Sequence, residues 1–143
     1  MKTSRRKSRE LALQALYEWQ LTANSTEAIT EQLRQNKNFA AADENYFSAL
    51  LTGATKDAQY LEQVIAPHLD RAFKSLSPIE RGVLLLAGYE LLRQPEVPYR
   101  VVINEAVELA KSYGGTDGYK YVNGVLDKLA ADLRPAETQR QSR

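Results

Sequence analysis

Hydrophobic residues recur along most of the chain three or four positions apart, as in an α-helix, and strand-like alternation is scarce. The first apolar stripe predicts a helix from about residue 4 to about residue 22, and a longer stripe predicts another over residues 43–67. Between them, Asn24 followed by Glu27 has the pattern of a helix start, and that short helix is expected to end near residues 36–38. The first half of the chain is therefore expected to be helical.

The second half of the chain contains a strong helix-start motif, Ser77-Pro78-Ile79-Glu80. It combines an N-cap serine, a proline at the first helical position and the glutamate of a capping box. The helix that it begins, through about Arg93, is apolar on most sides, which is the pattern of a buried central helix. A further helix is expected from Pro98 to Gly114, a glycine that could adopt the left-handed conformation of a helix C-terminus. The last helix is expected to begin near Asp117.

Together these patterns predict an all-α fold of about seven helices, including a short turn over residues 69–74, arranged as two small bundles around the central buried helix. We expect a single domain over residues 1–134 and a polar, disordered tail over residues 135–143. The chain contains no cysteine, which excludes disulfides and thiolate metal sites, and no apolar run long enough to span a bilayer. A cytoplasmic protein that needs no cofactor and no membrane fits these features.

The net charge of the whole chain is only +1, but its first ten residues are strongly basic. Arg5, Arg6 and Arg9 share one face of the first helix with Lys2, and Lys7 adds a further positive charge. That face continues into the core stripe of the helix, so its first two turns are expected to project beyond the body of the protein. Arginine can hold two phosphate oxygens at once, which makes this cluster a candidate RNA-binding site. The alternative is a solvated basic end with no specific role.

The remaining residues of interest give no enzyme signature. Tyr17 lies off the centre of the apolar stripe and is a candidate for contact with a ligand, whereas Trp19 is expected in the core. Glu105 and Glu108 are interpreted as a solvated helix face, and His68 as an ordinary surface residue. The segment GGTDGYK resembles a phosphate-binding loop, but it lacks the Gly-Lys-Ser/Thr ending and joins two helices.

Four segments resemble characteristic blocks of the NusB family of bacterial transcription antitermination factors. They keep the family's order and spacing, and the resemblance covers about residues 4 to 133. The blocks are RRKSRELALQALY at residues 5–17, IERGVLLLAGYEL at residues 79–91, VPYRVVINEAVELAKSYG at residues 97–114 and YVNGVLD at residues 121–127.

The resemblance implies a seven-helix fold and binding of the single-stranded boxA element of ribosomal RNA leader and antiterminator transcripts. It also implies a heterodimer with NusE, a small-subunit ribosomal protein, and a role for that pair in an antitermination complex on RNA polymerase. An exposed apolar partner surface could in addition self-associate, which would make the free protein a homodimer.

The resemblance also assigns roles to individual residues. The arginine-rich RNA-binding segment of the family matches Arg5, Arg6, Lys7 and Arg9, and Lys2 lies just before it. Positions that bind the protein partner match Tyr17 and Glu80. Asp117 matches an acidic position near the RNA path, and Lys120 lies close to it. Lys74 stands where family members can carry an acid in the partner interface, so a basic partner would have to rearrange or lose this contact.

Two other classes of protein fit parts of the sequence. One is an isolated NusB-like domain of a ribosomal RNA methyltransferase, which would need a separate domain with a glycine-rich nucleotide loop. The other is a helical scaffold with a basic end, for which RNA binding would be weak, sensitive to salt and indifferent to sequence.

Overall fold

The computed structural model describes residues 2–141, and the side chains of residues 4–139. Over this range the chain forms eight α-helices joined by short loops and three turns of 3-10 helix, at Lys37–Ala41, Ala66–His68 and Phe73–Ser75. The α-helices are α1 (Lys2–Leu21), α2 (Thr26–Leu33), α3 (Glu44–Lys56), α4 (Ala58–Ile65), α5 (Pro78–Arg93), α6 (Tyr99–Tyr113), α7 (Gly118–Leu133) and α8 (Pro135–Gln141).

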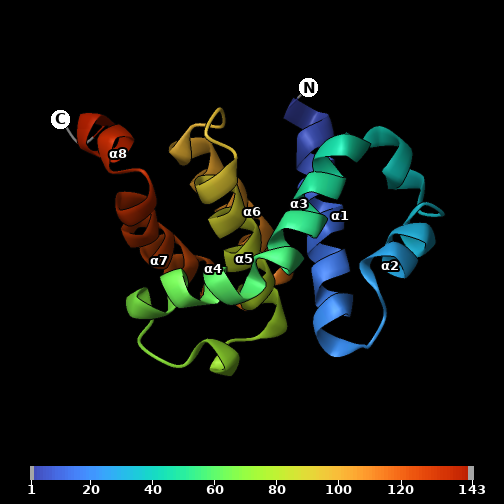
Figure 1. Ribbon diagram of the computed structural model, residues 1–143, viewed down its shortest axis with the longest axis horizontal. Helices are drawn as coiled ribbons and strands as arrows, with labels where there is room; N and C mark the ends of the chain where they lie inside the picture. The colour runs from blue at the N-terminus through green and yellow to red at the C-terminus, as the bar shows by residue number, and fades with distance from the viewer. Residues whose placement is uncertain (1, 142–143) are drawn as a thin grey trace.

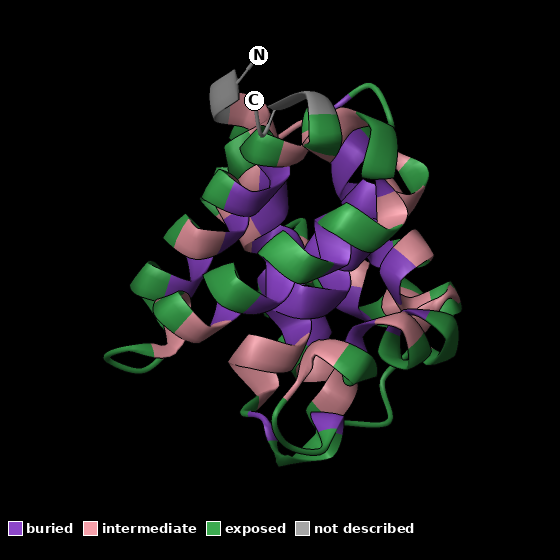
Figure 2. Ribbon diagram, turned by 90° about the vertical axis from the view of Figure 1, so that its left-hand side faces the viewer, coloured by how far each residue is buried: buried purple, intermediate pink, exposed green. Residues whose placement is uncertain are grey.

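Helix α5 occupies the centre of the molecule, between one group formed by α1, α2 and α3 and another formed by α4, α6 and α7 (Figure 1). It packs on α1, α3, α4, α6 and α7. Residues 82–91 of α5 are all buried, and the buried residues of the chain form one region in the middle of the molecule (Figure 2). The expected all-α fold of two bundles around a central helix is confirmed.

The start of α5 forms as its motif predicts. The backbone N–H of Glu80 donates to Ser77 Oγ at 3.1 Å, and the backbone N–H of Ser77 donates to Glu80 Oε1 at 3.2 Å. This reciprocal capping box satisfies two amide groups that the first turn of a helix leaves unpaired.

The long helix expected over residues 43–67 is instead two helices, because the chain bends at Asp57 between α3 and α4. Asp57 Oδ2 accepts a hydrogen bond from Arg93 Nε at 3.3 Å, which ties the bend to the end of α5. The bend lets Leu61 and Ile65 of α4 lie against Gly88 of α5, where an added Cβ would lie 3.3 Å and 3.5 Å from their methyl groups. Close packing of α4 on α5 therefore outweighs the continuous apolar stripe that predicted one helix.

Two smaller expectations about helix ends were wrong. The N-cap of α2 is Ser25, whose side chain accepts from the backbone N–H of Ala28 at 3.1 Å, rather than Asn24. Gly114 does end α6, but its φ is −95°, so no left-handed conformation is needed there. The turn expected over residues 69–74 is limited to the 3-10 turn at Phe73–Ser75.

The segment after Pro135, expected as a disordered tail, continues as α8 as far as Gln141. Glu137 anchors this helix, because its Oε2 accepts from the backbone N–H of Tyr99 at 2.9 Å and its Oε1 accepts from Arg134 Nη1 at 3.0 Å. One polar residue of this segment, Glu137, thus forms specific hydrogen bonds to the body. Among the described residues, no helix combines the length and apolar character that crossing a bilayer requires.

Candidate functional site

Helices α1 and α6 both pack on α5 and run in the same direction (Figure 1). Two pockets are lined by side chains of both helices, and we call the surface that contains them the α1–α6 valley. At one end of this α1–α6 valley is a basic groove of about 720 Å³, and at the other end is an apolar hollow of about 230 Å³. The basic groove is lined by Arg5, Arg6, Arg9, Glu96, Val97, Pro98, Val101, Asn104 and Glu105. The apolar hollow is lined by Leu13, Gln14, Tyr17, Ile79 and Tyr113.

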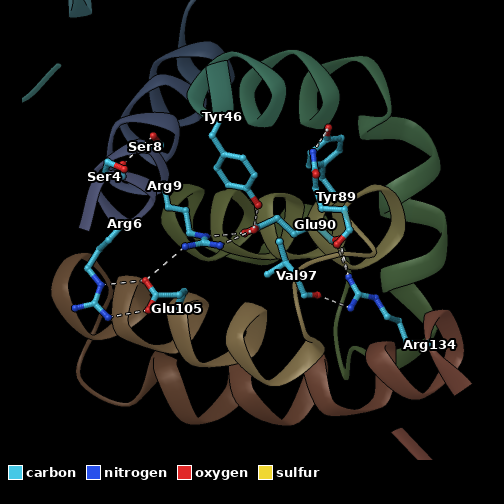
Figure 3. A network of polar contacts seen from close by, with 11 residues as sticks. Ser4, Arg6, Ser8, Arg9, Tyr46, Tyr89, Glu90, Val97, Glu105 and Arg134 are labelled. Atoms are coloured by element: carbon cyan, nitrogen blue, oxygen red, sulfur yellow. Dashed lines mark hydrogen bonds and ion pairs between the residues drawn. The ribbon is translucent and has the colours of Figure 1, made fainter. Parts of the chain in front are cut away.

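A buried polar network underlies the basic groove (Figure 3). Arg9 donates from Nε and Nη2 to the two carboxylate oxygens of Glu90, at 2.9 Å and 2.8 Å, and both side chains are buried. The hydroxyl of Tyr46 donates to Glu90 Oε2. Burial and the adjacent Glu90 carboxylate raise the pKa of Tyr46, so the phenol stays protonated as a donor. Arg9 is therefore neutralised within the core.

Arg6 carries the exposed part of the cluster. Its Nε and Nη2 donate to Glu105 at 3.0 Å and 2.8 Å, and Glu105 Oε1 also lies 3.8 Å from Arg9 Nη1. The guanidinium of Arg5 lies 4.1 Å from the ring centroid of Tyr46, in a cation–π contact. Arg5 and Arg6 thus stand on the rim of the groove in fixed orientations, while Arg9 forms part of its floor.

The first turns of α1 pack on the body instead of projecting beyond it, so that expectation was wrong. Ser8 is fully buried, and its hydroxyl oxygen lies 2.7 Å from the carbonyl oxygen of Asp43, just before α3. The backbone N–H of Asp43 donates in turn to the carbonyl of Ser4 at 3.2 Å. Small serines on this face let α3 approach α1 closely, so that Tyr46 of α3 reaches the guanidinium group of Arg5. The side chain of Lys2 lies outside the described residues.

The apolar hollow is formed by two exposed tyrosines. Tyr17 is 43 % exposed and Tyr113 is 42 % exposed, and both belong to the few large hydrophobic residues exposed to solvent. Partial burial and the nearby charge of Glu10 raise the pKa of Tyr113. Aromatic side chains with a free hydroxyl beside an apolar hollow are typical of protein interfaces.

Glu80 connects this hollow to the start of α7. Its Oε1 accepts the capping-box hydrogen bond, and a Cβ at Gly118 would lie 3.0 Å from its Oε2. Asp117 and Lys120 flank Gly118 and are both exposed, with a 3.6 Å contact between Lys120 Nζ and Asp117 Oδ1. These two predicted RNA contacts therefore lie beside a predicted partner contact.

The structure does not bring all the predicted RNA contacts together. Arg6 marks the basic groove and Tyr17 marks the apolar hollow. They are eleven positions apart on α1, which corresponds to roughly 16 Å along the helix axis. Lys7 points along the exposed side of α1, with its Nζ 3.9 Å from Glu10. An RNA that contacted both the basic groove and Asp117 would therefore have to follow the whole valley.

Lys74 belongs to a separate hollow of about 370 Å³ that also contains Trp19, Gln20 and Arg81. The carbonyl of Lys74 accepts from Arg81 Nη1 at 3.0 Å, so a second positive charge lies beside it. Trp19 is half-buried against the core, as expected. The hollow thus combines the positive charges of Lys74 and Arg81 with one acid, Glu62.

Two acids that organise the groove, Glu90 and Glu105, were not predicted from the sequence. Glu90 lies in the apolar part of α5 and is buried. An acid at such a position indicates a cationic partner, because a buried carboxylate requires one. Glu105 was interpreted as a solvated residue, but it pairs with Arg6 across the valley. Glu108 does pair with Lys111 on the exposed face, at 3.7 Å.

Comparisons with known proteins place these features in a family. The model of the NusB family matches residues 6–131. The transcription antitermination protein NusB of Paraburkholderia phytofirmans is 56 % identical over 139 residues, which cover 97 % of this chain and 96 % of that protein. The protein of the same name from Nitrosospira multiformis is 60 % identical over 129 residues, which cover 90 % of this chain and 82 % of that protein.

Solved structures agree with the sequence comparisons. NusB of T. maritima superposes with a TM-score of 0.83 at 31 % identity, covering 98 % of this chain and 99 % of that one. A chain from a crystal structure of the antitermination factors NusB and NusE in complex with double-stranded RNA superposes with a TM-score of 0.79 at 26 % identity, covering 92 % of this chain and 99 % of that one.

Proposed function

Because this chain belongs to the NusB family, we propose that it is a transcription antitermination factor that binds single-stranded boxA RNA together with NusE. It takes part in assembling the antitermination complex on RNA polymerase and acts there as an adaptor rather than an enzyme. The observation that carries the proposal is the similarity to antitermination proteins over nearly the whole chain.

The α1–α6 valley supports a division of roles along its length. Arg5 and Arg6 on the rim of the basic groove neutralise phosphates of the RNA. Tyr17 and Glu80, at the apolar hollow, contact NusE, and Asp117 and Lys120 stand where RNA and partner would meet. In the absence of NusE, a second copy of the chain would cover the exposed tyrosines.

The relatives favour this reading over an isolated domain of a methyltransferase. The matched antitermination proteins are covered over 96 % and 82 % of their own length, so the similarity extends over most of each antitermination factor. The alternative of a helical scaffold without specific RNA binding is distinguished from the proposed function by measuring RNA binding.

The proposal is tested by fluorescence anisotropy with a boxA-containing RNA and a scrambled RNA, with and without NusE, over a series of salt concentrations. We expect a preference for boxA that NusE increases, and a log–log salt slope of about −0.7 for each phosphate neutralised. Equal binding of both RNAs, with no effect of NusE, would leave only a basic-ended scaffold.

The double substitution Arg5→Ala and Arg6→Ala is expected to weaken boxA binding about ten- to hundredfold, because two charge-assisted phosphate contacts are lost. The salt slope should become shallower by about 1.4. The matched control is Lys56→Ala with Lys128→Ala, which removes the same charge from exposed positions outside the valley. Equal loss in both variants would mean that only net charge matters.

The substitution Tyr17→Ala is expected to weaken NusE binding by about 2 kcal/mol, roughly thirtyfold, because an exposed tyrosine at an apolar hollow is typical of an interface hot spot. Binding of boxA to the free protein should change less than twofold. Isothermal titration calorimetry measures the first and anisotropy the second. Tyr60→Ala, which removes a tyrosine exposed to 49 % on α4, should leave both unchanged. A larger effect on RNA than on NusE would show that Tyr17 belongs to the RNA site.

A further inference from the structure

The two walls of the basic groove differ in chemistry. The α1 wall carries the guanidinium groups of Arg5 and Arg6, whereas the opposite wall, formed by the start of α6 and the loop before it, includes an apolar part. This apolar part consists of Val97 and Pro98, just before α6, and of Val101 in the first turn of α6. Val101 is 41 % exposed. A volume of about 720 Å³ lies within the roughly 300–1,000 Å³ of typical small-ligand sites.

One polar side chain of the α6 wall has no structural role. Asn104 is exposed, and its amide makes no hydrogen bond with any side chain or backbone group that the structure describes. It follows Val101 by three positions on α6, so the two side chains share one face of the helix. A carboxamide offers one acceptor and two donors, which is the set that recognises the edge of a nucleobase.

The charges of the groove leave room for a phosphate. Glu105 is held by Arg6 and lies close to Arg9, so its negative charge is compensated. The hydrogen bonds of Arg6 to Glu105 use Nε and Nη2, and its Nη1 group donates to no described residue. Glu105 thus orients Arg6 so that a free guanidinium edge remains for an anion at the rim. Two further acids of the far side, Glu96 in the lining and Glu108 on α6, are exposed to water, which screens their charge.

We propose that the basic groove is a subsite for one unpaired nucleotide of the bound RNA. The phosphate lies at the rim against Arg5 and Arg6, the base lies against Pro98 and Val101, and the amide of Asn104 hydrogen-bonds to the base edge. Asn104 is then a residue that determines base preference, while the arginines bind any sequence. This assignment rests on the RNA-binding function proposed above and adds a position at which one base is read.

The test combines a substitution in the protein with removal of single bases from the RNA. Anisotropy titrations use the boxA-containing RNA and a series of the same RNA with one abasic nucleotide at each position in turn. Each RNA is titrated with the wild-type chain, with Asn104→Ala and with Gln63→Ala. Gln63 is an exposed amide on α4, away from the valley, and serves as the matched control.

We expect Asn104→Ala to weaken binding of the intact RNA about tenfold, and Gln63→Ala to change it less than twofold. For the RNA whose abasic position falls in the groove, Asn104→Ala should have no further effect, because the base that it contacts is already absent. For every other abasic RNA, the fold loss in affinity caused by the missing base and the fold loss caused by Asn104→Ala should multiply. The salt slope should be the same for Asn104→Ala and wild type, because no charge is removed.

Three results would overturn the assignment. Binding of Asn104→Ala equal to that of Gln63→Ala would show that the amide contacts no base. If Asn104→Ala weakened the binding of every abasic RNA equally, the substitution would have a general effect. If it weakened NusE binding without weakening RNA binding, the groove would be a binding site for the protein partner. Failure of the wild-type chain to prefer boxA would instead overturn the proposed function itself, which keeps the two hypotheses separable.

Discussion

Replacing Glu90 with leucine is expected to lower the free energy of unfolding by about 3–5 kcal/mol, because the guanidinium of Arg9 would remain buried without its carboxylate. The hydroxyl of Tyr46 would lose its acceptor in the same step. Urea unfolding monitored by circular dichroism measures the change.

Two further variants separate the destabilisation caused by an unpaired buried charge from the contribution of the ion pair to the free energy of unfolding. Glu90→Leu combined with Arg9→Met and Tyr46→Phe removes the three buried polar side chains of the network, and most of the lost stability should return. Glu108→Ala, which removes an exposed ion pair with Lys111, should change the free energy of unfolding by less than about 0.5 kcal/mol. A triple variant as unstable as Glu90→Leu alone would show that the network stabilises the fold through its own hydrogen bonds.

Replacing Arg134 with methionine is expected to lower the free energy of unfolding by about 3 kcal/mol. This arginine is 8 % exposed and donates to four backbone carbonyls, those of Glu90, Leu91, Gln94 and Val97, at distances between 2.6 and 3.0 Å. These carbonyls belong to the end of α5 and the loop after it, where the last turn of a helix leaves carbonyls without intrahelical partners. The carbonyls of Glu90 and Gln94 also accept from backbone N–H groups, whereas Arg134 satisfies those of Leu91 and Val97. Methionine fills a similar volume but offers no donor.

The same unfolding measurement distinguishes this effect from a loss of surface charge. Arg134→Lys should recover only part of the stability, since an ammonium group offers three donors and lacks the planar fork that reaches several carbonyls. Arg93→Ala, which removes an arginine 54 % exposed, should cost less than about 1 kcal/mol. An Arg134→Lys variant as stable as wild type would show that charge, rather than hydrogen-bond geometry, holds α5 in place.

Most of the helices were predicted from local sequence patterns, because each pattern involves only residues that are close together in the chain. The capping box at Ser77 and the stripe on α7 depend only on neighbouring residues, and both appear as expected. The bend at Asp57 was missed because its cause is distant: α4 turns to pack on Gly88, thirty-one positions later in the chain. Helix α8 was missed for the same reason, since Glu137 is fixed by Tyr99.

The candidate site was predicted in its composition but not in its geometry. Spacing on α1 grouped Arg5, Arg6 and Arg9 on one face, yet it could not show that a carboxylate on α5 draws Arg9 into the core. Nor could it show that Glu105 stands opposite Arg6, because the pairing joins residues ninety-nine positions apart. Resemblance to the family supplied Tyr17 and Glu80, which the structure places around one hollow and its neighbouring helix start.

The central position of α5 also determines how the native protein opens. Its backbone amides are covered by α1, α3, α4, α6 and α7 at once, so exchange of their hydrogens with solvent requires the whole domain to unfold. Helix α2, in contrast, packs chiefly on α1 and can separate from the body in a local fluctuation. Such a fluctuation leaves the floor between α1 and α6 intact, so the protein can flex at its edge while the spacing between the basic groove and the apolar hollow is preserved.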